Sequence, residues 1–96
     1  MRTYNYKGHK VYLEKEEYRN NWTLALMMYE VDGELFGNVT FNLNHHIQSK
    51  DMAFLDENNF PGIGKWLSEK DLGISMGYEV RSEFCSYPLY MVFNQE

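Results

Sequence analysis

The stretch that decides the fold reads WTLALMMYEVDGELFGNVTFNL and covers residues 22–43. Asp32-Gly33 at its centre is a strong signal for a two-residue hairpin loop, because a type I′ turn requires a positive φ at both central positions. With that turn set between Val31 and Glu34, the flanking strands pair in a single register. The stretch therefore predicts a β-hairpin at the centre of the fold.

The side-chain pattern supports the same register. One side of the predicted hairpin receives apolar pairs, which are Leu26 with Val39, Leu24 with Phe41, and Trp22 with Leu43. The other side receives Thr23 with Asn42, Ala25 with Thr40, and Met27 with Asn38. A slip of one residue would exchange the two faces and scatter the apolar set. Turn chemistry and pattern agree, so we expect the apolar side to face the core.

Length and composition indicate one globular domain, which we expect to span residues 1–96. The hydrophobic fraction of 44% and the charged fraction of 24% are ordinary for such a domain. The net charge of −5 argues against direct binding to nucleic acid or to an anionic membrane, since both attract clustered Lys and Arg. Mild acidity serves solubility, and the alternative is a surface that meets a basic protein partner.

The single cysteine, Cys85, excludes an internal disulfide. The first residues carry no apolar signal segment, and no apolar run approaches the ~20 residues of a transmembrane helix. We therefore expect a reduced, cytoplasmic protein. Oligomeric state does not follow from the sequence.

Further strands are predicted on both sides of the hairpin. Residues 3–6 and 10–16 read as an opening hairpin with the three-residue loop 7–9, and Tyr18-Arg19-Asn20-Asn21 reads as a turn. Residues 52–55 form either a short strand or a tether. Residues 74–81 and 87–93 read as the last strands, with Pro88 at a strand start or a sheet edge because it lacks an N–H.

Residues 60–72 are the helix candidate. Pro61 suits the first turn, Asn59 is the better capping residue, and Gly73 suits the left-handed residue that ends a helix. The stripe expected to pack on the sheet contains Ile63, Trp66 and Leu67. The order of elements predicts an α+β fold, an antiparallel β-meander of about 5–6 strands with one α-helix on one face.

No catalytic motif is found, and we expect a non-enzymatic protein without a cofactor. His45-His46 is the most conspicuous pair, but adjacent residues on an extended chain point to opposite sides, and zinc sites need three or four ligands. Cys85 would act as a nucleophile only beside a base. A small metal-dependent or thiol enzyme that uses His45, His46 or Cys85 is the alternative.

The aromatic residues suggest a binding surface. Tyr29 and Phe36 are predicted neighbours on the side of the hairpin turned away from Leu24 and Leu26, and they either pack across the strands or await a partner. The candidate protein-contact patch at the hairpin tip contains Tyr29, Glu30, Asp32, Glu34 and Phe36. A DNA-mimic inhibitor of a nucleic-acid-binding protein is a further alternative.

Several motifs resemble those of a known family. Asp56-Glu57-Asn58-Asn59-Phe60-Pro61-Gly62-Ile63 and Phe84-Cys85-Ser86-Tyr87-Pro88-Leu89-Tyr90 are similar to a family of small bacterial proteins catalogued as a domain of unknown function. The resemblance covers about residues 18–93, and Glu83 stands where the family pattern has Gly. It implies no activity, cofactor or catalytic residue. It does imply a setting on plasmids, conjugative elements or phages.

Overall fold

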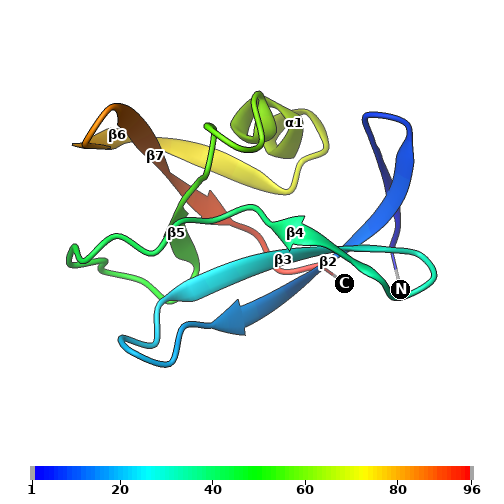
Figure 1. The fold of residues 1–96 in the computed structure, drawn as a ribbon, viewed down its shortest axis with the longest axis horizontal. Coiled ribbons are helices and arrows are strands. Elements are labelled where there is room, and N and C mark those ends of the chain that lie inside the picture. The colour runs from blue at the N-terminus through cyan, green and yellow to red at the C-terminus, as the bar shows by residue number, and fades with distance from the viewer. Residues whose placement is uncertain (1, 96) are drawn as a thin grey trace.

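The structure, a computed structural model, describes residues 2–95, and these contain seven strands and one helix (Figure 1). In chain order they are β1 (Tyr4–Tyr6), β2 (His9–Glu17), β3 (Leu24–Glu30), β4 (Leu35–Asn38), β5 (Met52–Phe54), α1 (Ile63–Glu69), β6 (Gly73–Ser82) and β7 (Cys85–Val92). One antiparallel sheet has the order β1-β2-β3-β4, and the other has the order β5-β7-β6. The predicted α+β class is confirmed, with the strands divided between two sheets.

The central hairpin has the predicted register but a different turn. Met27 pairs with Asn38, and the amide of Val39 donates to the carbonyl of Leu26 at 3.0 Å. The loop has three residues, however, since the amide of Glu30 bonds to the carbonyl of Glu34 and only Gly33 has a positive φ. The type I′ prediction is therefore wrong. A register shift between Met28 and Tyr29 absorbs the extra residue, so the pairs beyond it match the prediction.

The opening hairpin differs in the opposite sense. Tyr6 pairs with His9, which leaves a loop of two residues. Lys7 has φ 49° and Gly8 has φ 87°, the pair of positive values that a type I′ turn requires. The predicted three-residue loop is wrong.

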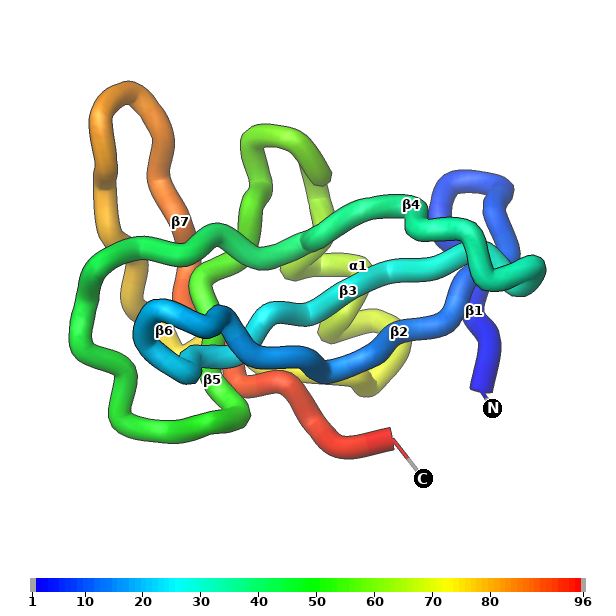
Figure 2. Tube along the Cα trace, turned by 60° about the horizontal axis from the view of Figure 1, so that its bottom comes forward, coloured from blue at the N-terminus to red at the C-terminus, as the bar shows by residue number. Residues whose placement is uncertain are grey.

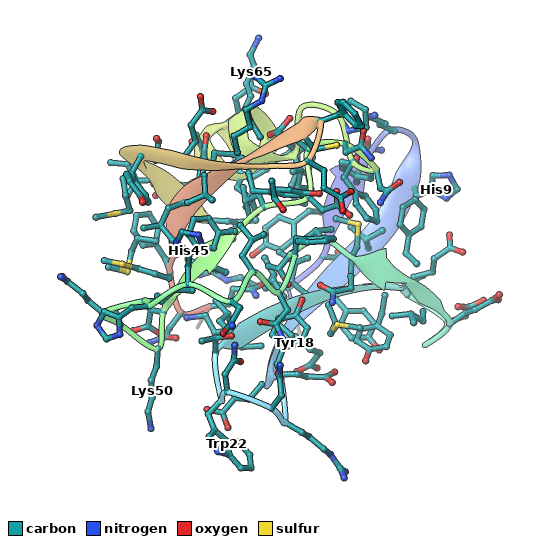
Figure 3. The ribbon with its side chains drawn as sticks, turned by 60° about the vertical axis from the view of Figure 1, so that its left-hand side comes forward. His9, Tyr18, Trp22, His45, Lys50 and Lys65 are labelled. Atoms are coloured by element: carbon teal, nitrogen blue, oxygen red, sulfur yellow. The ribbon has the colours of Figure 1, made fainter. Side chains whose placement is uncertain are left out.

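The far end of the central hairpin separates instead of pairing. β3 begins at Leu24, so Trp22 lies in the preceding turn, 65% exposed and with φ 60° (Figure 3). Phe41 turns to the other sheet, where its amide donates to the carbonyl of Phe54 and its ring stacks on Tyr87 with centroids 4.4 Å apart. The predicted pairs of Trp22 with Leu43 and of Leu24 with Phe41 are absent from the ladder.

Residues 39–41 join the two sheets, and we call them the crossing segment (Figure 2). The amide of Val39 bonds to β3, while its carbonyl accepts from the amide of Asp56 at 2.8 Å. Thr40 forms an isolated antiparallel bridge with Leu55. One stretch of backbone therefore hydrogen-bonds to both sheets.

The main core lies between the two sheets and the helix. Its fully buried members include Val11, Leu26, Met28, Val39, Leu55, Ile63 and Leu67. A smaller cluster on the other side of the second sheet contains Leu43, Phe54, Val80 and Tyr87. Of the apolar side of the central hairpin, Leu24, Leu26 and Val39 face the main core as predicted. Trp22 and Phe41 are exposed instead, and Leu43 belongs to the smaller cluster.

The helix is shorter than the predicted residues 60–72. It begins after Gly62, which has a φ of 83°. Gly62 occupies the N-cap position and has no side chain that could cap the helix. The carboxylate of Glu57 instead accepts from the amides of Gly62 and Gly64, and Asn59 bonds to Asp56. Asn59 is therefore not the cap.

The helix also ends earlier than expected. The left-handed residue after it is Asp71, with φ 60°, and Gly73 belongs to β6. The predicted packing stripe is confirmed, because Ile63 and Leu67 are fully buried and Trp66 packs against the same core.

In the second sheet, β7 is the central strand, so Pro88 does not lie at a strand start or an edge. β6 has a bulge opposite it. Ser75 pairs with Tyr90 and Glu79 with Pro88, so three residues of β6 face one residue of β7. Pro88 follows this irregularity, where a missing ladder bond is tolerated.

The turn between β6 and β7 gives a stability prediction. Ser82 pairs with Cys85, and Glu83 in the two-residue loop has φ 56°, a left-handed conformation that costs an L-residue roughly 1–2 kcal/mol. Glu83→Gly should therefore raise the free energy of unfolding in urea by about 0.5–1 kcal/mol after the entropic cost of Gly. Arg81→Gly, at an extended exposed position of the same hairpin, should lower it. A loss of stability in Glu83→Gly would contradict this assignment.

Candidate protein-contact face

The first sheet has one face toward the core and one away from it. Figure 1 shows α1 and the strands of the second sheet on the same side of β2 and β3. Partners directly opposite each other in an antiparallel ladder point to the same face. The ladder therefore places Val11, Leu13, Leu26 and Met28 toward the core, and on the opposite side it places Tyr12 with Tyr29, Glu14 with Met27, and Leu35 with Tyr29.

We define the outer face as Tyr12, Glu14, Glu16, Met27, Tyr29 and Leu35. Leu35 is 53% exposed, and the two glutamates are also exposed. Tyr12, Met27 and Tyr29 are half-buried by one another and by their neighbours on the sheet. Apolar side chains with solvent above them thus adjoin two carboxylates.

The two tyrosines form the centre of the outer face. Their rings are stacked, with centroids 5.3 Å apart and planes 18° from parallel. The hydroxyl of Tyr29 donates to Oε2 of Glu16 at 2.8 Å. This hydrogen bond to the carboxylate, together with desolvation, raises the pKa of Tyr29 above its ordinary value of 10.0. The stack and the bond thus link Tyr12, Tyr29 and Glu16 across β2 and β3.

The structure separates Tyr29 from Phe36, which the predicted hairpin placed together. The register shift puts Leu35 opposite Tyr29 and turns Phe36 to the core side. There the ring of Phe36 makes edge contacts with Tyr6 and His9, at centroid distances of 5.7 and 4.9 Å. The prediction that Phe36 lies on the outer side is therefore wrong, because the β-bulge reverses the alternation of side chains.

The acidic residues of the predicted patch are also divided. Oε1 of Glu30 lies 3.0 Å from Nδ1 of His9, at the rim of the core side. Asp32 accepts from the amide of Glu34 through Oδ1 at 3.0 Å, a contact that closes the turn. Glu34 itself is exposed at the tip. Of the predicted patch, only Tyr29 belongs to the outer face.

A network of hydroxyl and amide groups closes the end of the outer face near the crossing segment. The hydroxyl of Tyr18 accepts from Nδ2 of Asn38 and lies 2.9 Å from Oγ1 of Thr40. The hydroxyl of Thr40 donates to Oδ1 of Asn38 at 2.6 Å and accepts from the amide of Leu26 at 3.2 Å. Thr40 is buried, so these bonds satisfy a group that would be costly to leave unpaired.

The residues of the enzyme alternative lie elsewhere. The ring of His45 contacts Phe54 at a centroid distance of 6.1 Å, and His46 is exposed. Cys85 is half-buried beside Tyr87, whose pKa is raised by burial and by the neighbouring thiol. Among the residues that the structure describes, no group of three or more His, Cys, Asp or Glu side chains is placed to share a metal ion.

Sequence reasoning missed a second apolar surface. A groove of about 350 Å³ lies on the side of the second sheet away from the helix, and its lining includes Ile47, Met52, Met76, Tyr78 and Leu89. Met76 and Tyr78 are 41% and 54% exposed. Gly77, which lies between them, was the only hint of this surface in the sequence, because a glycine inside a strand often marks a bulge.

The described residues form a small two-sheet α+β fold in which the outer face of the first sheet carries stacked tyrosines beside two glutamates. The chain belongs to the family described as Domain of unknown function (DUF4313), whose model matches residues 12–96. Comparison with the curated proteins and with the solved structures gave no match. Within residues 2–95, no helix is both long and apolar enough to cross a membrane.

The bond between Tyr29 and Glu16 gives a titration prediction. Because the pKa of Tyr29 is raised above 10.0, the contribution of the bond to stability is present below pH 10.0 and is lost as the pH rises through the folded pKa. Glu16→Gln should lower the pKa of Tyr29, measured from the ring signals by NMR. Glu14→Gln should lower it less, because Glu14 acts only at longer range. An unchanged pKa in Glu16→Gln would refute the bond.

Proposed function

We propose that this protein is a small, non-enzymatic accessory protein that acts by binding another protein through the outer face. The observation that carries the proposal is the stack of Tyr12 and Tyr29 on a sheet face over which residues 2–95 place no helix or strand. Flat aromatic side chains lose little entropy on binding and are enriched among residues that dominate binding energy. An exposed apolar patch beside charges is typical of an interaction site.

The charge of the chain indicates the kind of partner. Glu14 and Glu16 adjoin the tyrosines, and the chain carries a net charge of −5. Carboxylates around an aromatic centre attract a basic partner and raise its association rate. The partner we propose is therefore a protein with a basic surface.

The setting is part of the same proposal. The motifs that resemble proteins of plasmids, conjugative elements and phages suggest a mobile-element protein. The single cysteine suggests a reduced, cytoplasmic environment. An accessory protein of such an element would meet its partner there.

Affinity measurements on variants of the outer face test this function. A partner isolated from the source organism should bind Tyr29→Ala more weakly by about 2 kcal/mol or more, the range of residues that dominate an interface. Charge reversal by Glu14→Lys with Glu16→Lys should mainly slow association, with an effect that shrinks as salt rises. Thermal melts of each variant establish that it remains folded.

Phe84→Ala is the matched control, because Phe84 is 94% exposed at the tip of the second sheet and outside the outer face. It should leave affinity unchanged. Loss of binding in Phe84→Ala with full binding in a folded Tyr29→Ala would contradict the proposed face.

A further inference from the structure

One edge of β2 is open over two thirds of the strand, residues 12–17. β1 pairs only with residues 9–11 of β2, whereas β3 pairs with residues 11–17. In the part of the chain that the structure describes, no strand pairs with the other edge of residues 12–17. An open edge presents unpaired amide and carbonyl groups, which are a template for another extended chain.

The alternation of the ladder identifies these groups. The two-residue loop makes Tyr6 and His9 a hydrogen-bonded pair, so every second residue from His9 points its amide and carbonyl toward the β1 side. Two hydrogen bonds agree with this alternation. The carbonyl of Lys10 accepts from the amide of Val31 on the β3 side, and the carbonyl of Leu13 accepts from the side chain of Gln95 on the β1 side. The edge groups therefore belong to Leu13, Lys15 and Glu17.

The edge is accessible from a cleft. A space of about 500 Å³ lies between residues 12–15 of β2 and the side chains of Arg2, Asn94 and Gln95. Figure 2 shows the C-terminal segment passing beside β2. The amide group of Gln95 reaches the carbonyl of Leu13 at 3.4 Å, which is longer than a strong N–H···O bond. This contact is weak enough for an incoming backbone amide to replace it.

The charge beside the edge is negative. Glu14, Glu16 and Glu17 are exposed along the open stretch. The cation within this stretch, Lys15, is held, because its Nζ lies 2.9 Å from Oδ1 of Asp51 and donates to the carbonyl of Val92 and to Asn94. Arg2 lies across the cleft, so three glutamates on the strand stand against one cation of the cleft wall. Like charges directly opposite each other destabilise a strand pair, and opposite charges stabilise it.

We propose that the open edge of β2 binds an extended segment of a protein partner, added as an antiparallel strand with Lys or Arg at alternate positions over Glu14 and Glu16. The segment extends the first sheet, and its cationic side chains lie beside Tyr12 on the outer face. This inference rests on the proposed function, and it names the element of the partner that is recognised.

A second copy of the chain fits the edge poorly. Pairing of β2 with β2 of another molecule would bring Glu14, Glu16 and Glu17 of the two strands together, which is a repulsive arrangement. Like charges on an edge prevent self-association in this way, while they leave the edge open to a cationic strand.

Amide hydrogen exchange of the free protein tests the edge itself. The amides of Leu13, Lys15 and Glu17 should exchange at least about tenfold faster than those of Tyr12, Glu14 and Glu16, which bond to β3. Equal protection of both sets would overturn the proposal, since it would mean that the edge is covered, either within the chain or by a second copy.

The probe for binding is the capped peptide acetyl-Lys-Val-Lys-Val-Lys-Val-amide. Its addition should slow exchange at Leu13, Lys15 and Glu17 and leave Glu14 and Glu16 unchanged. With lysines over the glutamates, the valine amides bond to β2. N-methylation of the valine nitrogens should therefore abolish binding, whereas N-methylation of the lysine nitrogens should preserve it. Equal binding of both methylated peptides would refute strand addition.

Charge variants of the protein and of the peptide provide a second test. Glu14→Lys with Glu16→Lys should weaken the peptide about tenfold or more at low salt, and the peptide with Glu in place of Lys should not bind. A partner whose affinity depends on Tyr29 but which leaves the edge amides unprotected would refute strand addition and leave the proposed function standing. A partner insensitive to Tyr29→Ala would refute the proposed function, whatever the peptide does.

Discussion

The fold depends on the backbone of the crossing segment, where the chain leaves one sheet and enters the other. Val39 gives its amide to β3 and its carbonyl to Asp56, and Phe41 bonds to β5. At Thr40 the backbone of the crossing segment has turned away from β3, and the Thr40 hydroxyl accepts from the amide of Leu26 in its place. Buried amides need such partners, so the hydroxyl allows β3 to continue while its neighbouring strand departs. Both sheets are thereby fixed around one core.

The sequence predicted those parts of the fold that depend on local pattern. Alternation of apolar residues gave the pairing of β3 with β4, and helical spacing gave the buried stripe of Ile63 and Leu67. The lengths of the two hairpin loops were predicted the wrong way round, because the preference of Asp-Gly for a type I′ turn is a local one that the packing of the flanking strands overrides. The division into two sheets was not visible, since nothing local marks the residue at which a strand changes partners.

The sequence predicted an aromatic residue of the candidate site, Tyr29, but not which residues lie beside it. Tyr29 lies outside as the register of the hairpin implied, whereas its stack with Tyr12 was not predicted. Phe36 was misplaced by a single bulge, because one extra residue reverses every side chain between the bulge and the turn. The open edge of β2 follows from the short length of β1, whose first residue, Tyr4, pairs with Val11. No local pattern in the sequence marks this limit of the pairing, so the open edge was not predicted.

The most direct test of this account is the urea unfolding of Thr40→Val, followed separately in each sheet by the NMR ring signals of Tyr29 and Tyr87. Valine keeps the shape of threonine but leaves the amide of Leu26 without a partner. It also removes the contacts of the Thr40 hydroxyl with Tyr18 and Asn38, which stay bonded to each other. The account predicts that both signals shift to the same lower midpoint, with a loss of about 2–3 kcal/mol, and that Thr40→Ser keeps most of the stability. An unchanged midpoint, or separate transitions for the two sheets in the wild-type protein, would contradict it.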